Sequence, residues 1–267
     1  MNIATLPAGR SDHRPDGMSE EEWDARVQLA ACYRLIDHFG MTDLIYNHIT
    51  ARVPGPEHHF LINPFGPHYS EITASGLVKV DLDGRPVDDP PDSPGTRINP
   101  AGYVIHACIH RARPDLQAVI HTHTRAGIAV SCLEEGLIPM EQNGYQFLDR
   151  IAYHDYEGIA LDEAEQARLL ADLGDCDAMI LRNHGLLACG ANISQAFRRI
   201  YYLEMACKIQ LDVMASGALR QPPAAVQAHT AAQWHDGTAG NGGANDETLE
   251  WPALLRLMDR KDAGYRT

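Results

Sequence analysis

Apolar residues recur three or four positions apart after Ser19, and Gly40 follows directly after this run. Ser19 and Glu22 have the spacing of a capping box, in which each side chain satisfies a backbone N–H of the first helical turn. Glycine is the common stop at a helix C-terminus because it adopts the left-handed conformation without strain. The pattern therefore predicts a helix from Ser19 to His38.

Short apolar runs bounded by turn residues predict strands elsewhere. They lie at Asn47–Val53, His59–Asn63, Leu77–Leu82, Ala118–His123, Ile151–Tyr156, Ala178–Leu181 and Leu186–Cys189. Helical spacing predicts further helices at Pro100–Arg113, Thr124–Leu133, Asp162–Leu173 and Ser194–Ser216. Because strands and helices mix without strict alternation, we expect one α/β domain whose central sheet is at least partly antiparallel.

Composition sets the limits of this domain. Residues 1–18 are rich in Pro, Gly, Arg and Asp and predict a flexible N-terminal arm, followed by the domain itself over residues 19–220. Residues 221–248 are rich in Ala, Gly, Thr, Asn and Gln, which is typical of a flexible linker. A C-terminal helical segment is expected at 249–267, with its helix over Glu250–Asp259.

Charge and cysteine content narrow the class of protein. The net charge is −14, whereas nucleic acids and anionic membranes select a basic surface, so we expect neither as a partner. The six cysteines contain no CxxC pair and mostly have apolar neighbours, which favours buried thiols. With no signal-peptide pattern and no apolar run of membrane-spanning length, a cytoplasmic location is expected.

Two of the fourteen histidines, His121 and His123, are separated by one residue in a predicted strand. Side chains at i and i+2 of a strand project from the same face, about 6–7 Å apart. Two imidazoles at that separation can converge on one metal ion with bonds of about 2.0–2.1 Å. His184 lies in a turn after another predicted strand and completes the ligand set if the two strands are neighbours. Gly185 would let a bound ion or substrate approach the backbone.

The remaining histidines have simpler interpretations. His106 and His110 lie on a predicted helix and His48 lies within a predicted strand, so a hydrogen-bonded structural role is expected for all three. His154 is also interpreted as structural, since its neighbour Asp155 points to the opposite face of the strand.

Four motifs together resemble the class II aldolase/adducin family, in order and in spacing. They are YNHIT at 46–50, ITASG at 72–76, HTH at 121–123 and RNHG at 182–185. The likeness covers roughly residues 24–217 and is especially close to the head domain of adducin.

The resemblance implies a single three-layer α/β/α domain around a mostly antiparallel sheet, usually assembled as a homotetramer. It also implies a divalent metal on His121, His123 and His184, with Fe²⁺ or Zn²⁺ favoured and Mn²⁺ a third option. A substrate-binding role is implied for four more residues, namely Asn47, Thr73, Ser75 and Gly76.

The chain departs from the family's sugar-phosphate aldolases at two points. Their acid/base glutamate aligns with Gly102, and their phosphate-binding serines align with Pro100 and Ala101. Their tyrosine acid, which a neighbouring subunit supplies, does not align cleanly. Glu141 and Tyr145 lie in that segment and are the candidates for catalytic groups.

Three functions follow from these motifs. The first is a metal-dependent lyase that cleaves a C–C bond beside a carbonyl in a small, non-phosphorylated 2-oxo or 2-hydroxy acid, by decarboxylation or by a retro-aldol reaction. The second is a three-histidine, non-haem Fe(II) oxygenase that oxidatively decarboxylates an aryl-pyruvate-type acid in secondary metabolism. The third is a non-catalytic interaction module similar to adducin.

Overall fold

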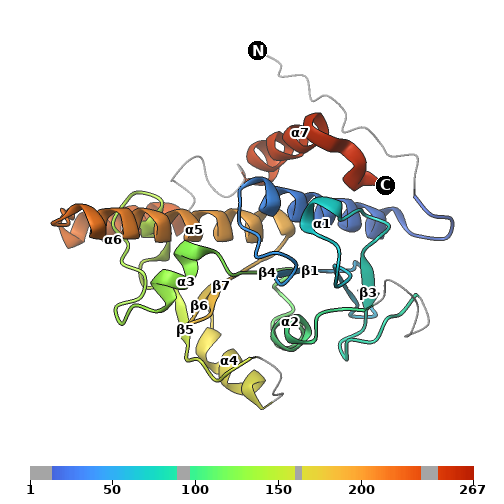
Figure 1. Ribbon diagram of the computed structural model, residues 1–267, viewed down its shortest axis with the longest axis horizontal. Coiled ribbons are helices and arrows are strands. Elements are labelled where there is room, and N and C mark those ends of the chain that lie inside the picture. The colour runs from blue at the N-terminus through green and yellow to red at the C-terminus, as the bar shows by residue number, and fades with distance from the viewer. Residues whose placement is uncertain (1–13, 89–96, 160–163, 236–245) are drawn as a thin grey trace.

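A seven-stranded mixed sheet forms the centre of the protein in the computed structural model, which describes residues 14–88, 97–159, 164–235 and 246–267 (Figure 1). The spatial order of its strands is β3-β2-β1-β4-β7-β6-β5. The strands are β1 His48–Arg52, β2 Phe60–Ile62, β3 Val78–Val80, β4 Ala118–Thr122, β5 Ala152–His154, β6 Ala178–Leu181 and β7 Gly185–Gly190. All neighbours pair antiparallel except β5 and β6, so the sheet is mostly antiparallel, as predicted.

Helices cover both faces of this sheet. They are α1 Glu20–His38, α2 Pro100–Ala112, α3 Arg125–Ser131, α4 Glu165–Leu173, α5 Ile193–Ser216, α6 Ala224–His235 and α7 Trp251–Asp262. Figure 1 shows α1 and α5 on one side of the sheet and α2 and α4 on the other. The predicted three-layer α/β/α fold is therefore confirmed.

The two faces of the sheet pack into separate hydrophobic cores. Ala118 and Ile120 of β4 pack with α1 and α5, whereas Val119 between them packs with α2 and α4. The same alternation occurs in β7, where Leu186 and Leu187 belong to different cores. Because both faces are covered, strands β1, β4, β6 and β7 are buried along almost their whole length, and a polar side chain on either face needs a buried partner.

The first helix begins as predicted, but its capping box is only half formed. The Ser19 hydroxyl accepts a hydrogen bond from the Glu22 N–H at 3.0 Å. The Glu22 carboxylate does not return to the cap; it pairs instead with Arg26 at 2.9 Å and with Lys79 of β3 at 3.0 Å. The tertiary ion pair thus replaces a local contact and fastens α1 to the edge of the sheet.

The prediction of a flexible linker was wrong over Ala224–His235, because these residues form helix α6. Its Trp234 indole N–H donates to the Gln142 carbonyl at 2.8 Å, which holds the helix against the body. An alanine-rich composition suits a helix as well as a linker, and here tertiary contact decides. Residues 236–245 of the predicted linker lie outside the described residues. So do residues 1–13 of the expected arm and residues 162 and 163 of the predicted helix Asp162–Leu173.

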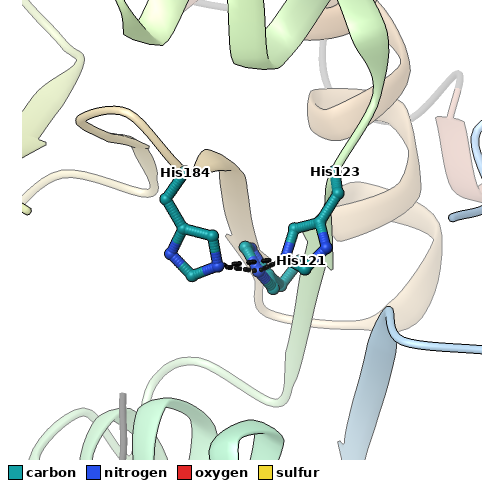
Figure 2. A group of neighbouring side chains, drawn as sticks. All are labelled: His121, His123 and His184. Atoms are coloured by element: carbon teal, nitrogen blue, oxygen red, sulfur yellow. Dashed lines mark hydrogen bonds between the residues drawn. The ribbon is translucent and has the colours of Figure 1, made fainter. Parts of the chain in front are cut away.

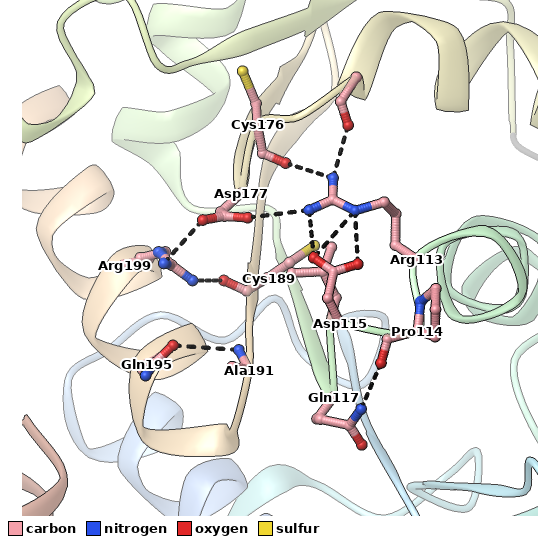
Figure 3. A network of polar contacts seen from close by, with 12 residues as sticks. Arg113, Pro114, Asp115, Gln117, Cys176, Asp177, Cys189, Ala191, Gln195 and Arg199 are labelled. Atoms are coloured by element: carbon pink, nitrogen blue, oxygen red, sulfur yellow. Dashed lines mark hydrogen bonds and ion pairs between the residues drawn. The ribbon is translucent and has the colours of Figure 1, made fainter. Parts of the chain in front are cut away.

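A polar network ties together the strand ends that lie opposite the predicted metal ligands (Figure 3). Arg113 donates three hydrogen bonds to Asp115, the shortest at 2.7 Å, and forms an ion pair with Asp177 at 3.6 Å. Asp177 also pairs with Arg199 of α5 at 2.9 Å, and Arg199 donates to the Cys189 carbonyl at 2.6 Å. The network therefore joins the start of β4, the end of β7 and the helix that covers them.

The C-terminal helix α7 docks on the body of its own chain, beside α1 (Figure 1). Trp251, Met258 and Tyr265 are buried in the same core as α1 and α5. Beyond α7, the Tyr265 and Thr267 carbonyls accept hydrogen bonds from the backbone N–H groups of Ala74 and Ser75, both at 2.9 Å. Among the described residues, no helix has the length and apolar character needed to cross a membrane.

Removing the Met258 side chain should destabilise the fold by about 2–5 kcal/mol, since it leaves a cavity where α7 packs. Met258 is 3% exposed, whereas Leu249 just before the helix is 57% exposed. Leu249→Ala is therefore the matched control and should change the free energy of unfolding by less than about 0.5 kcal/mol. Urea denaturation of both variants measures the difference. Equal effects would show that α7 does not contribute to the core.

Candidate metal centre

The three predicted ligands meet at the ends of neighbouring strands. His121 is the next-to-last residue of β4, His123 directly follows that strand, and His184 directly precedes β7 (Figure 2). Since β4 and β7 pair antiparallel, the end of one lies beside the start of the other. The structure thus brings together residues that are 61 and 63 positions apart.

Two backbone features of the turn place His184. Asn183 adopts a positive φ of 56°, a left-handed conformation that asparagine tolerates better than most residues. A Cβ at Gly185 would lie 2.4 Å from the Thr122 carbonyl oxygen, so only glycine lets this turn pack against β4. The sequence had suggested that Gly185 makes room for an ion or substrate; in the structure it makes room for the neighbouring strand.

The Nε2 atoms of the three imidazoles face one another. They are 2.7 Å apart between His121 and His123, 3.0 Å between His123 and His184, and 3.2 Å between His121 and His184. Tetrahedral bonds of about 2.0–2.1 Å would set such donor atoms about 3.3 Å apart. The observed triangle is therefore close to the size that a tetrahedral metal site needs.

The Nδ1 atoms of two of these rings fix which nitrogen carries the proton. His121 Nδ1 lies 2.9 Å from the Leu186 carbonyl oxygen, and His123 Nδ1 lies 3.0 Å from the Asp43 carboxylate. A carbonyl and a carboxylate can only accept, so each Nδ1 donates. In a neutral imidazole this leaves a lone pair on Nε2, and lone pairs that converge at these distances repel unless a cation lies between them.

Burial keeps two of the rings, those of His121 and His184, in the neutral, ligating form. Desolvation lowers the pKa of the fully buried His121 well below its usual value, with the neighbouring histidines adding to the effect. The same cause lowers the pKa of His184 to about 4, with a further contribution from His123. Because a metal competes with protons for these nitrogens, low pKa values favour metal binding at neutral pH. Donor type, geometry and protonation state thus all fit a divalent metal.

Asp43, which the sequence analysis did not single out, is held in place by Asn47. The Asn47 side chain accepts a hydrogen bond from the Asp43 backbone N–H at 2.7 Å and donates to the His121 carbonyl at 3.3 Å. Asn47, predicted to bind substrate, is buried and uses its amide in this internal contact. Sequence alone could not identify Asp43, since it lies 80 positions before His123.

The other predicted substrate-binding residues lie in the turn between η1 (Tyr69–Glu71) and β3. The Thr73 hydroxyl accepts a hydrogen bond from the Gly76 N–H at 3.2 Å, and it lies 3.5 Å from the Ser75 hydroxyl. In the described part of the chain, the hydrogen bonds of residues 73–76 are made within this turn and with the C-terminal segment. Substrate binding by Thr73, Ser75 and Gly76 therefore stays a prediction.

The two predicted catalytic groups lie in the loop around the short helix η2, Gly144–Phe147. The Glu141 carboxylate accepts hydrogen bonds from the Asn143 and Gly144 N–H groups, the first at 2.7 Å. The Tyr145 side chain is buried, and its hydroxyl has no hydrogen-bond partner in the described part of the chain. No hydrogen bond in the described part of the chain joins either residue to the three histidines, and their catalytic role stays a prediction.

A chain of buried polar side chains lies beside the metal centre on the α2 face of the sheet. His48 Nδ1 shares a hydrogen bond of 2.9 Å with His106 Nε2, and His106 Nδ1 lies 2.8 Å from the Thr50 hydroxyl. The same hydroxyl lies 2.7 Å from His110 Nε2. These hydrogen bonds agree with the structural roles expected for the three histidines, but their joining into one chain was not predicted.

Comparison with known proteins connects this site to one family. The model of the Class II Aldolase and Adducin N-terminal domain matches residues 27–211. The chain is 48% identical over 253 residues to a candidate class 2 aldolase of Pseudomonas aeruginosa, covering 93% of this chain and 94% of that protein. It is 42% identical over 251 residues to alpha-adducin of Rattus norvegicus, covering 91% of this chain but 34% of that protein. A solved aldolase II superfamily protein from Pseudomonas syringae shares the fold with a TM-score of 0.85 and 52% identity, over 94% of this chain and 98% of that one.

Asp43→Asn should weaken metal binding about 10- to 100-fold, because the carboxylate that orients His123 and raises its basicity is lost. Zinc titration against a competing chelator measures this. Asp83→Asn is the matched control, since Asp83 is exposed and pairs only with surface arginines in the described part of the chain. Equal affinities for the two variants would contradict the orienting role.

The lowered pKa of His184 predicts a pH dependence of stability in the metal-free protein. Between about 4 and its usual value of 6.5, the unfolded chain binds a proton here that the folded chain does not, so stability falls as the pH drops through this range. His184→Asn removes this contribution. Urea denaturation near pH 5.5 should show a slope of unfolding free energy against pH that is smaller by up to about 1.4 kcal/mol per pH unit. An unchanged slope would show that burial does not lower this pKa.

Proposed function

Since the chain belongs to the class II aldolase and adducin family, we propose that it is a metal-dependent lyase acting on a small 2-oxo or 2-hydroxy acid that carries no phosphate. The reaction cleaves the C–C bond next to the carbonyl carbon. The observation that carries this proposal is the convergence of three Nε2 atoms, two of whose lone pairs are set by the Leu186 carbonyl and the Asp43 carboxylate. Three protein ligands leave a position open for a substrate, which is typical of catalytic metal sites.

His121, His123 and His184 would hold the metal, with Zn²⁺ and Fe²⁺ as the first choices and Mn²⁺ as the third. Bound there, a divalent ion supplies Lewis acidity for the negative charge that develops as the C–C bond breaks. The chain's own residues fix the direction from which a substrate reaches the metal. The Nδ1 contacts hold the rings of His121 and His123, and the Asn183–Gly185 turn holds His184.

Gly102 favours decarboxylation over a sugar-phosphate aldol reaction. Glycine has no side chain to abstract a proton, and a Cβ at this position would lie 2.5 Å from the His48 ring. Loss of carbon dioxide from the carbon next to the carbonyl would move the bonding electrons onto the carbonyl oxygen without prior removal of a proton, so it would not require a carboxylate at position 102. Glu141 and Tyr145 remain candidates to act across a subunit interface, and a homotetramer is part of the proposal.

The similarity to alpha-adducin favours a second candidate, a non-catalytic interaction module. At 42% identity over 91% of this chain, the adducin head is almost as similar as the bacterial relative. In that case the metal would be structural or absent, and the three histidines would serve the fold. In the first candidate the reaction depends on the metal, whereas in the second at most the fold does.

Metal analysis of protein purified without chelators or a nickel column tests the proposal. We expect about one zinc, manganese or iron ion per chain, and release of carbon dioxide or an aldehyde from one of a panel of 2-oxo and 2-hydroxy acids. His121→Ala should lose the metal and the activity, whereas His229→Ala, at an exposed position, should keep both. Iron together with oxygen uptake on adding an aryl-pyruvate would identify the oxygenase instead. No metal, with unchanged stability in His121→Ala, would exclude both enzymatic functions.

A further inference from the structure

Position 102 and the His48 ring compete for the same space. A Cβ built on Gly102 would lie 2.5 Å from His48 Cδ2, 2.6 Å from Cγ and 3.0 Å from Nε2. Real Cβ atoms do not approach carbon atoms so closely, so any other residue at position 102 would displace the imidazole. The glycine at this position is therefore the condition for His48 to lie where it does.

His48 lies directly beside the metal centre. Its backbone pairs with that of His121 in the antiparallel ladder between β1 and β4, so the two side chains project from the same face. Their ring centroids are 5.0 Å apart, with an angle of 36° between the ring planes. His48 is not one of the three predicted ligands, but its ring thus lies beside that of His121, the most deeply buried ligand.

The orientation of the His48 ring is fixed from one side. Its Nδ1 is bonded to His106, which the Thr50 hydroxyl connects to His110. All four side chains are buried, so this chain cannot exchange its hydrogen bonds for water without loss. A rigid ring with one nitrogen engaged presents its other nitrogen in a defined direction.

That other nitrogen, Nε2, has no hydrogen-bond partner in the described part of the chain. It is not one of the side-chain atoms that are enclosed without a partner, in contrast to His110 Nδ1. Although the residue as a whole is only 2% exposed, Nε2 therefore reaches a water-accessible surface. A buried imidazole with a single open nitrogen beside a metal centre is arranged to bind a polar group there.

We propose that His48 is a substrate-binding residue whose Nε2 forms a hydrogen bond to an oxygen of the acid held at the metal centre. It takes the place that a longer side chain at position 102 would occupy, and His106, Thr50 and His110 position it. This inference rests on the proposed function, because it requires a metal-bound acid as the ligand. It assigns specificity for a small oxygen-rich acid to the pairing of Gly102 with His48.

Amide variants at position 48 separate the two nitrogens. The side-chain amide of Asn can occupy the position of Nδ1 and keep the bond to His106, whereas that of Gln can reach the position of Nε2. Binding of oxalate, a two-oxygen mimic of a 2-oxo acid, is measured by calorimetry on zinc-loaded protein, with zinc content and thermal unfolding determined in parallel. We expect His48→Asn to bind one zinc but to lose oxalate affinity about 10- to 100-fold, the effect of one hydrogen bond to a charged group. His48→Gln should recover at least part of that affinity.

Two further variants test the positioning of the ring. Thr50→Val removes the hydroxyl that joins His106 to His110 and should weaken oxalate binding with zinc retained. Thr122→Val is the matched control, since this hydroxyl is also buried but has no partner in the described part of the chain, and β-strand alternation places it on the opposite face. Its oxalate affinity should equal that of the wild type.

The outcomes separate the inference from the proposed function. Wild-type protein that binds zinc but not oxalate would overturn both. Wild-type protein that binds oxalate, with equal affinity in His48→Asn at equal zinc content, would overturn the role of His48 alone. Loss of zinc from a folded His48→Asn would assign His48 to metal binding and would also overturn the inference.

Discussion

The hydrogen bond from His121 Nδ1 to the Leu186 carbonyl joins a side chain of β4 to the backbone of β7, and the metal centre depends on it. The bond exists because antiparallel pairing sets Leu187 opposite His121. It determines the tautomer of His121, directs the Nε2 lone pair away from the sheet and fixes the ring to the strand that begins just after His184. A shift of one residue in this pairing would turn His121 to the opposite face and disperse the site.

Burial of both faces of the sheet explains the chain of polar side chains on the α2 face. Helices cover both faces of the sheet, so the Thr50 hydroxyl and the His48 Nδ1, which β1 projects toward α2, need partners within the protein. Thr50 and His48 find them in His106 and His110 of α2. Gly102, on the same helix, allows this approach. The loss of a carboxylate at position 102 and the chain of histidines are therefore two parts of one arrangement.

The sequence predicted the elements that have a regular hydrophobic pattern and the residues that belong to a motif. The His121–His123 spacing indicated a shared strand face, and apolar alternation located the strands of both cores. Asp43 escaped prediction because only tertiary contact brings it to His123, and the same holds for the ion pair that diverts Glu22 from its cap. Helix α6 escaped because its composition suits a linker equally well. The contact of the turn at Ala74 and Ser75 with the C-terminal segment was not predicted either, since no local pattern marks it.

X-ray absorption spectroscopy of the zinc-loaded protein tests the central claim most directly, because it measures the ligands of the bound ion. The account predicts three imidazole nitrogens at about 2.0–2.1 Å, with the multiple-scattering pattern of histidine rings, and at least one further light atom at a position open to exchange. A first shell containing sulfur, or one made only of carboxylate and water oxygens, would contradict it.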